Sequence, residues 1–415
     1  MPSFEHVSTA FRDAFGGAPS VLLSAPGRVN LIGEHGDYTL LPVLPIAIDR
    51  SLQFAARATD GGAVMVRSAA YDPPARVERA RPQHVGAQWQ RYITGVLLEL
   101  EAIAPGRGAE VAVVGDLPAD GGLSSSSAFS VGLIAALSRA WDEPLPPGEC
   151  AERAIRAERV VGAETGGMDQ RVVALGTAGH ALRIDFLPLA IRHVPVPAGL
   201  TFVIANSGIR APKRGAARDA YNERVVGTRI AALLLADMLG VETEGIPVLG
   251  NVAEIDVVDI MVEEPPDKMS ARDAARSAKV DPKELARLSA GDFDQNLALP
   301  VKRYARHVLS EAARVGAAEQ ALSGGDLKRF GALLNESHNS LREDYRCSTP
   351  ELDRVAAAMR KVGALGARIT GAGFGGYAVA AVETGNEAPV IEAAIGAAGG
   401  PSFVVTASDG LAFGP

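Results

Sequence analysis

The sequence predicts an α+β protein built from two domains. Strand-like and helix-like segments alternate along its 415 residues, a length that suits two domains. Apolar residues make up 47% of the chain and charged residues 22%, values typical of a globular protein. The proline-containing stretch RHVPVPAG predicts a boundary near residue 195, which gives domains over residues 1–195 and 196–415.

The first domain is predicted to begin with a short amphipathic helix over residues 1–15, whose phenylalanines and Val7 recur on one side. Apolar alternation, glycine turns and a Pro-Pro helix start define the elements that follow. They are strands over 51–58 and 62–69 paired as a hairpin at Gly61-Gly62, a strand over 109–117, an apolar helix opened by Gly121-Gly122, a helix over 146–162 and a strand over 180–186.

The second domain repeats this mixture of strands and helices. Residues 241 to about 300 differ from the rest because they are acidic, irregular and contain prolines, so we interpret them as an insert. The expected elements are strands over 200–206, 366–370, 377–382 and 402–410, and helices over 218–239, 304–322 and 327–342.

Composition excludes several function classes. A net charge of −8 argues against a nucleic-acid partner or an anionic membrane surface. No apolar stretch reaches the roughly 18 residues that span a bilayer, and the N-terminus does not resemble a signal peptide. Cys150 and Cys347 are too few for a disulfide framework or a zinc site. We therefore expect a cytoplasmic protein with neither nucleic acid nor membrane as a partner, and either a monomer or a dimer is compatible with the sequence.

The stretch LPADGGLSSSSAF, residues 117–129, places two glycines and four serines in front of an apolar helix. Backbone N–H groups at the positive end of a helix form an anion site, and glycines let the backbone approach the ligand. Serine hydroxyls can bind phosphate oxygens or Mg²⁺. A serine-rich helix cap without a ligand is the alternative. The chain has no GxxxxGK[ST], so this is not the P-loop of the common NTPases.

A second glycine loop, GAGFGG at residues 371–376, matches the GxGxxG pattern of dinucleotide-binding folds. That fold requires a helix after the loop, whereas YAVAAV follows here and is strand-like. We interpret the loop as a tight turn between two strands, close to a ligand.

Two further stretches carry clustered polar residues. In APGRVNLIGEHGDY, residues 25–38, polar groups of both signs surround an apolar core, which suits recognition of several hydroxyls at once; an ion-paired turn is the alternative. In AERVVGAETGGMDQRVVALG, residues 157–176, Glu158 lies on a helix and Asp169 follows a glycine turn. Such a carboxylate can be a general base or a metal ligand, or Asp169 can simply cap the helix that follows.

Together these stretches resemble the GHMP small-molecule kinases, and the galactokinase branch most closely. GRVNLIGEHGDY is similar to the signature GRVNLIGEHTDYN, and GLSSSSAF is similar to the phosphate loop GLSSSA. The stretches GMDQRVVALGTAGHALRID, NESHNSLREDYRCSTPELD, TGAGFGG and TASDG extend the resemblance over residues 20 to 410, except for the insert.

The resemblance implies an N-terminal domain like domain 2 of ribosomal protein S5 and a ferredoxin-like C-terminal domain, which bind ATP, Mg²⁺ and a sugar. It implies phosphorylation of the anomeric hydroxyl of a monosaccharide, most closely galactose. The implied catalytic residues are Asp169, facing the sugar O1, and Arg28, beside the transferring phosphoryl group. The other residues implied by the match are Glu34, His35, Gly36, Asp37, Gly166 and Tyr221 for the sugar; Asp120, Gly121, Gly122, Leu123, Ser124, Ser125, Ser126 and Ser68 for the nucleotide; and Ser126 and Glu158 for Mg²⁺.

Departures from the family pattern leave the sugar open. Gly36 replaces the signature threonine, and Thr39-Leu40-Leu41-Pro42 replaces Asn-Gly-Gly-Phe. Asp120 stands where the phosphate loop usually has glycine, and Ser127 where it has alanine. Another aldose or a uronic acid is an alternative substrate, since Lys213 and Arg214 could meet a carboxylate. A catalytically silent sugar- and ATP-binding sensor is the alternative from another class, and a kinase for a non-sugar alcohol is a weaker one.

Overall fold

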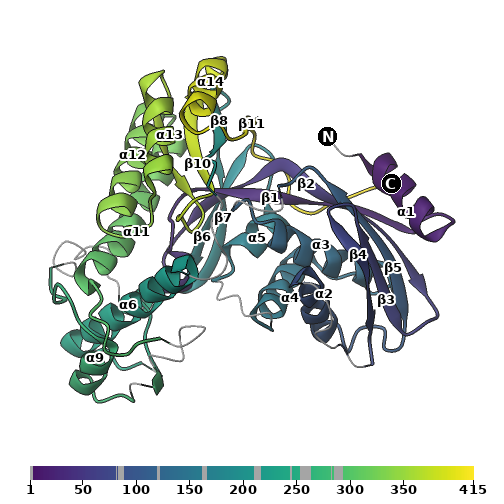
Figure 1. The fold of residues 1–415 in the computed structure, drawn as a ribbon, viewed down its shortest axis with the longest axis horizontal. Helices are drawn as coiled ribbons and strands as arrows, with labels where there is room; N and C mark the ends of the chain where they lie inside the picture. The colour runs from purple at the N-terminus through teal and green to yellow at the C-terminus, as the bar shows by residue number, and fades with distance from the viewer. Residues whose placement is uncertain are drawn as a thin grey trace. The chain divides into compact units, whose positions relative to one another are not determined.

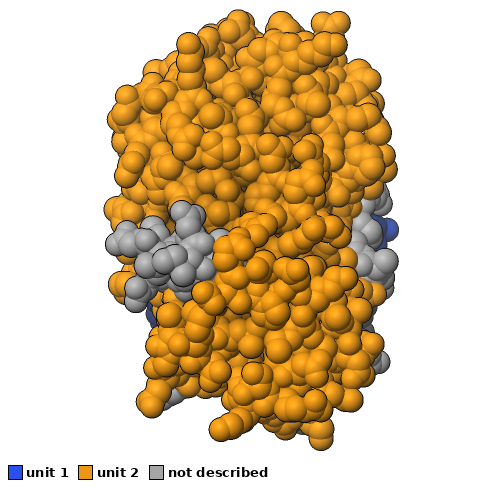
Figure 2. All heavy atoms as spheres, turned by 90° about the vertical axis from the view of Figure 1, so that its left-hand side faces the viewer, with its two compact units in different colours: residues 1–29, 46–181, 406–415 blue, residues 30–45, 182–405 orange. Residues whose placement is uncertain are grey.

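The structure is a computed structural model that describes residues 3–80, 82, 88–118, 122–160, 166–209, 216–243, 245–252, 263–281, 283–284 and 293–415. These residues form two compact units. Unit 1 comprises residues 1–29, 46–181 and 406–415, and unit 2 comprises residues 30–45 and 182–405 (Figure 2). The single domain boundary expected near residue 195 stays a prediction. Among the residues described, no helix combines the length and the apolar character that crossing a membrane requires.

Unit 1 is built on a six-stranded sheet with the order β12-β1-β2-β5-β3-β4 (Figure 1). Successive residues of β2 point to opposite faces of this sheet. Ala55 packs with Val7 and Phe11 of α1 on one face. Phe54 contacts Gly132 of α3 on the other. The elements are α1 (Phe4–Phe15), β1 (Val21–Ile32), β2 (Leu44–Thr59), β3 (Ala63–Ser68), β4 (Tyr71–Glu78), α2 (Gln88–Glu99), β5 (Gly108–Gly115), α3 (Ser125–Ala140), α4 (Pro147–Val160), α5 (Met168–Leu175) and β12 (Ala412–Phe413); β1 and β2 continue into unit 2.

The predicted hairpin between residues 51–58 and 62–69 is wrong. Both segments are strands, but β5 lies between them, antiparallel to β2 and parallel to β3. The turn at Gly61 fixes where the chain bends, not which strands pair. β5 is almost wholly buried and takes the central position, and its Gly108 admits the close approach, since a Cβ there would lie 2.1 Å from the Gly61 carbonyl oxygen.

Unit 2 contains a four-stranded antiparallel sheet with the order β11-β8-β10-β9, a two-stranded sheet β6-β7 and a set of long helices. α12, α13 and α14 pack against the larger sheet, and α11 packs against α12 and α6 (Figure 1). The elements are η1 (Asp37–Thr39), β6 (His180–Phe186), β7 (Leu189–Pro195), β8 (Leu200–Asn206), α6 (Ala216–Leu239), α7 (Leu249–Val252), α9 (Ala271–Ser277), α11 (Val301–Ser323), α12 (Leu327–Glu343), α13 (Pro350–Lys361), β9 (Gly366–Thr370), β10 (Tyr377–Glu383), α14 (Glu387–Ala398) and β11 (Ser402–Val405).

The α+β class is confirmed, and the other predicted helices and strands overlap elements of the structure, although β2 begins at Leu44, before the expected residue 51, and β11 ends at Val405, before the expected residue 410. The second glycine loop, residues 371–376, joins β9 to β10, which pair antiparallel from Thr370 and Tyr377 onward. Rejection of a dinucleotide-binding fold is therefore confirmed. The insert contains α7 and α9 among its described residues.

Candidate active site

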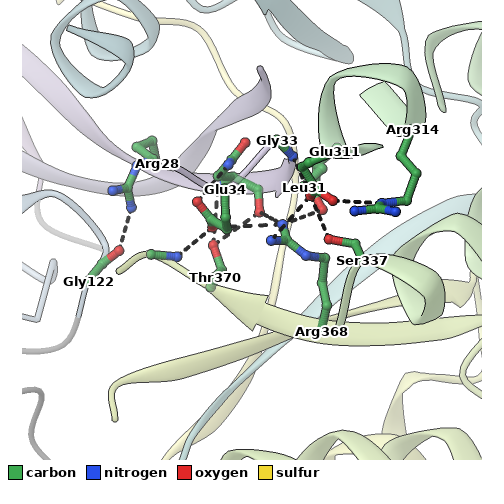
Figure 3. Close-up of polar contacts among 12 residues, drawn as sticks. Arg28, Leu31, Gly33, Glu34, Gly122, Glu311, Arg314, Ser337, Arg368 and Thr370 are labelled. Atoms are coloured by element: carbon green, nitrogen blue, oxygen red, sulfur yellow. Dashed lines mark hydrogen bonds and ion pairs between the residues drawn. The ribbon is translucent and has the colours of Figure 1, made fainter. Parts of the chain in front are cut away.

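Arg28 and Asp169 form a bidentate ion pair in unit 1. The Arg28 side chain is 7% exposed, and its Nε and Nη2 donate to Asp169 Oδ1 and Oδ2 at 2.7 and 2.8 Å. Arg28 Nη1 donates to the carbonyl oxygen of Gly122 (Figure 3). Two parallel charged hydrogen bonds fix the plane of the carboxylate as well as its position.

Asp169 reaches this position from the first turn of α5. The N-cap of α5 is Gly167, whose φ of +93° lies in the region that glycine tolerates, and the interpretation of Asp169 as the cap is wrong. The Asp169 carboxylate is instead directed to Arg28 and to Ser124, whose Oγ donates to Oδ2 at 2.5 Å. Three donors from two other segments therefore hold one carboxylate that is still 23% exposed.

The glycine–serine loop is attached to β1 by its backbone. Arg28 N donates to the carbonyl oxygen of Leu123 at 3.1 Å, and Gly27 permits this approach, since a Cβ there would lie 2.8 Å from the same oxygen. Ser124 is the N-cap of α3 in a left-handed conformation and makes no side-chain cap, because its hydroxyl is directed to Asp169. Asp120 and Gly121 lie outside the described residues.

Glu158 is a buried carboxylate on α4, 4% exposed. Burial raises its pKa to about 7, the nearby Asp169 adds to the rise, and the polar side chains of Gln170, Ser127 and Ser130 offset part of it. Its Oε1 has no hydrogen-bond partner among the residues described. A buried carboxylate oxygen with spare acceptor capacity, near serine hydroxyls, is an oxygen donor set that fits Mg²⁺.

Ser126 and Ser127 lie on the first turn of α3, where Ser126 is partly exposed and Ser127 is buried. The structure places Ser127 close to Glu158, so Ser127 is a polar neighbour of the predicted metal ligand that sequence reasoning did not assign. Among the described residues, no group of three or more His, Cys, Asp or Glu side chains gathers as a metal cage. Mg²⁺ with one or two protein ligands and several phosphate or water ligands is the arrangement that this donor set suits.

In unit 2 the signature residue Glu34 is almost fully buried, at 3% exposed (Figure 3). Its Oε1 accepts a hydrogen bond from the Gly371 backbone N at 2.6 Å, and its Oε2 accepts one from Asn30 Nδ2 at 2.8 Å. Thr370 Oγ1 in turn contacts the Asn30 backbone N and O, each at 3.1 Å. Glu34 thus ties the signature to the second glycine loop.

Arg368 of β9 is completely buried and neutralises two carboxylates. Its Nη1 lies 3.7 Å from Glu34 Oε1 and donates to the Leu31 carbonyl oxygen at 2.9 Å, while its Nη2 lies 3.8 Å from Glu311 Oε1 (Figure 3). Burial alone would raise the pKa of Glu311, but Arg314 and Arg368 hold it well below its usual range.

Glu311, on α11, reaches the signature directly. Its Oε1 accepts hydrogen bonds from the Gly33 backbone N at 3.0 Å and from Ser337 Oγ at 2.6 Å, and its Oε2 accepts one from Arg314 Nε at 2.7 Å. Gly33, at φ +104°, has no room for a Cβ, which would lie 2.8 Å from the Val43 Cα. Sequence reasoning missed Glu311, Arg314 and Arg368; their only signal is a charged residue inside an otherwise apolar helix or strand pattern.

His35 belongs to a buried aromatic cluster. Its ring lies 4.4 Å from that of Tyr345 and 6.1 Å from that of Tyr221, and its Nδ1 lies 3.1 Å from the Tyr38 hydroxyl, which is 2.5 Å from the Tyr345 hydroxyl. Burial, followed by the neighbouring His307, lowers the pKa of His35 well below its usual range, so the ring is neutral. Its buried Nε2 has no hydrogen-bond partner among the described residues. The structure therefore brings the predicted sugar residues His35 and Tyr221 together, and it adds Tyr345.

The remaining predicted residues occupy three places. Gly36 and half-buried Asp37 lie at the start of η1. The Gly166 carbonyl oxygen accepts a hydrogen bond from Arg171 Nη1 at 3.1 Å. Ser68 ends β3 in unit 1, where it lines a hollow of about 360 Å³ together with Arg67 and Asp72.

Comparison with known proteins identifies the family whose fold this chain shares. Residues 9–58 match a family model described as the galactokinase galactose-binding signature, residues 91–177 the GHMP kinases N-terminal domain, and residues 317–401 the GHMP kinases C-terminal domain. The fold and the site thus define a GHMP kinase. Two mevalonate kinase structures at 15–16% identity, with TM-scores of 0.59 and 0.60, share the fold.

Relatives that match nearly the whole chain identify the branch of the GHMP kinases to which it belongs. Galactokinase of Chloroflexus aggregans is 37% identical over 381 residues, which cover 91% of this chain and 87% of that protein. Galactokinase of Streptomyces coelicolor is 35% identical, covering 95% and 93%. The crystal structure of Lactococcus lactis galactokinase complexed with galactose is 26% identical, covers 98% and 99%, and has a TM-score of 0.79. The chain belongs to the galactokinase family.

The raised pKa of Glu158 predicts how the stability of metal-free protein depends on pH. The proton is bound more tightly in the folded state, so this stabilising term is fully present below pH 4.5 and is lost as the pH rises through about 7. In EDTA at pH 8, Glu158→Gln should therefore be more stable than the wild type by on the order of 3 kcal/mol. At pH 4.5 the difference should nearly vanish.

Urea unfolding at the two pH values measures this difference, and the exposed Glu101→Gln is the control, with little change at either pH. A Glu158→Gln difference that is the same at pH 4.5 and pH 8 would show that the carboxyl is not held in its protonated form by burial.

Proposed function

We propose that this chain transfers the γ-phosphoryl group of ATP to the anomeric hydroxyl of galactose and releases galactose 1-phosphate and ADP. The observation that carries the proposal is the bidentate Arg28–Asp169 pair, joined to the glycine–serine loop through Gly122 and Ser124. Membership of the galactokinase family supports galactose as the sugar. The assembled pair favours an enzyme over a silent sugar-binding sensor.

In this proposal Asp169 orients the anomeric hydroxyl and accepts its proton as the new O–P bond forms. The bond between the γ-phosphorus and the bridging oxygen breaks, and ADP leaves with the electron pair. A carboxylate fixed by Arg28 and Ser124 needs no reorganisation to do this. The Arg28 guanidinium stabilises the negative charge that is shared between the transferring group and Asp169.

Glu158 and Ser126 are the proposed ligands of Mg²⁺. Glu158 Oε1 is a buried acceptor without a partner among the described residues, and Ser126 lies on the first turn of α3 with a partly exposed side chain. When bound, Mg²⁺ neutralises the β- and γ-phosphate oxygens of ATP. The phosphate-binding part of the proposed nucleotide site is the loop backbone at the start of α3, formed by Gly122, Leu123, Ser124 and Ser125. We propose Ser68 as a further residue of the nucleotide site.

The proposed sugar site is the signature loop of unit 2. Asp37 is an acceptor for ring hydroxyls, and His35, neutral and with a buried Nε2, can exchange a further hydrogen bond. Tyr221 supplies an aromatic face beside His35. Both carboxylate oxygens of Glu34 already accept hydrogen bonds, from Gly371 and Asn30, and we propose Glu34 as a sugar contact that these bonds hold in place. Gly36 and Gly166 are proposed as backbone contacts.

We also propose that the protein works in the cytoplasm. Cys150 and Cys347 are both free and buried, and burial raises the pKa of each thiol to about 12. Inert thiols of this kind suit a reducing compartment.

The function is tested by ADP release with Mg²⁺ and a panel of galactose, N-acetylgalactosamine, arabinose, glucuronate and galacturonate. The wild type should turn over galactose fastest. Asp169→Asn should lose about 10²–10⁴ in kcat, because the amide cannot take the proton, while galactose binding measured by calorimetry largely survives. Near wild-type kcat in Asp169→Asn would rule out the assignment of the base.

Substitution of each of the two serines on the first turn of α3 distinguishes the proposed metal ligand from the residue that only contacts Glu158. Ser126→Ala should raise the Mg²⁺ concentration needed for half-maximal turnover, because a hydroxyl ligand is lost. Ser127→Ala should change this requirement much less, because the related phosphate loops carry alanine there; its loss leaves Glu158 with one polar neighbour fewer but removes no proposed metal ligand. A larger shift of the Mg²⁺ requirement in Ser127→Ala than in Ser126→Ala would mean that the register through the four serines is off by one.

Asp37→Ala tests whether the signature loop recognises the sugar. Loss of this half-buried acceptor leaves a substrate hydroxyl unpaired, at roughly 1–3 kcal/mol, so kcat/KM for galactose should fall about ten- to a hundredfold. A deoxy analogue that lacks the hydroxyl bound by Asp37 should lose much less. Equal losses for galactose and every deoxygalactose would mean that Asp37 only supports the loop.

A further inference from the structure

The insert supplies a short helix that packs against the signature loop. Leu249 and Val252 of α7 are buried in the same hydrophobic cluster of unit 2 as Leu41. Gly250, between them, faces Leu40 so closely that a Cβ would lie 2.5 Å from its carbonyl oxygen and 2.9 Å from its carbonyl carbon. These are backbone atoms that cannot rotate away, so glycine at 250 is required by the approach of the two segments.

Leu40 links α7 to the residues that are proposed to bind the sugar. It ends η1 in a left-handed conformation, φ 59° and ψ 31°, and its N donates to the Asp37 carbonyl oxygen at 3.2 Å. Leu41 N donates to the Gly36 carbonyl oxygen at 2.9 Å. A leucine in this conformation is unfavourable by about 1–2 kcal/mol unless its surroundings hold it there. Displacement of Leu40 therefore displaces the backbone of Gly36 and Asp37.

We propose that Gly250 is a positioning residue for the sugar, and that α7 of the insert sets the position of η1 and hence of Asp37. The inference rests on the proposed function, since it assumes that Asp37 contacts the sugar. It gives the insert a role in sugar affinity and none in the binding of ATP, whose proposed residues lie in unit 1.

The test compares Gly250→Ala with Gly396→Ala. Gly396 lies on α14 of the same unit, is exposed, and has no atom within 4 Å of its added Cβ. Neither glycine has a positive φ, so the two changes differ in the contact and not in backbone strain. Gly250→Ala should raise KM for galactose about tenfold while KM for ATP stays within about twofold. Gly396→Ala should leave both constants unchanged.

A second substitution tests the coupling. Leu40→Gly lets the backbone at position 40 shift without strain, so Leu40→Gly/Gly250→Ala should have a lower KM for galactose than Gly250→Ala. If Gly250→Ala does not fold, Leu40→Gly alone carries the test, and a loosened η1 should raise KM for galactose about threefold with ATP unaffected.

The proposal is overturned if Gly250→Ala lowers the melting temperature but leaves KM for galactose unchanged, or if KM for ATP rises equally. Unchanged constants in Leu40→Gly, where only that variant folds, overturn it as well. Failure of the proposed function is a different result, because it appears as absent galactose turnover in the wild type.

Discussion

The signature region of unit 2 depends on one buried cation, Arg368. A fully buried guanidinium is tolerated only where carboxylates and carbonyl oxygens surround it. Glu34 and Glu311 supply the carboxylates, and the carbonyl oxygens of Asn30 and Leu31 supply the rest. Removal of any one charge would leave a buried network whose charges no longer balance, which costs several kcal/mol. The fold of this region therefore requires the charge network, independently of any role that the network has in ligand binding.

This constraint explains why the signature holds its shape. Glu34 and Glu311 each accept hydrogen bonds from a backbone N–H of a glycine, Gly371 and Gly33, which ties two loops to the same charge. The two histidines of the region are neutral, because burial lowers the pKa of His307 to about 4 and that of His35 below its usual range. Neutral imidazoles and tyrosine hydroxyls next to a compensated ion network are a surface for a neutral, hydroxyl-rich ligand.

Local patterns predicted many of the helices and strands because such elements depend on neighbours in sequence, but β1, β4, α2, β7, α13 and α14 were not predicted. The hairpin at Gly61-Gly62 failed because the pairing of β3 is decided by β5, some 40 residues further along the chain, and burial rather than the turn selects the partner. Arg28, Asp169 and the serine loop could be proposed as site residues because their residue types match a family motif. Glu311 and Arg368 were not, since a buried ion pair has no local signature and its members lie far apart in sequence from Glu34. Ser127 was passed over for the same reason: its role comes from Glu158 on another helix.

The charged groups proposed for phosphate and metal binding differ in their pairing from those of the signature region. Glu158 Oε1, a buried acceptor without a partner among the described residues, and the exposed part of the Asp169 carboxylate lie in unit 1, among the residues proposed for phosphate and Mg²⁺. In the signature region of unit 2, the two buried arginines are already committed. Arg368 faces Glu34 and Glu311, and Arg224 donates to the carbonyl oxygens of Ala220, Tyr345 and Arg346. Lys213 and Arg214, which the sequence offers to a uronic acid carboxylate, lie outside the described residues. Of the described arginines, Arg368 and Arg224 could pair with such a carboxylate only by leaving a present partner, at the cost of an unpaired buried group. Galactose carries no charge and requires no such exchange of ion-pair partners. Within the described residues, the electrostatics therefore favour a neutral sugar.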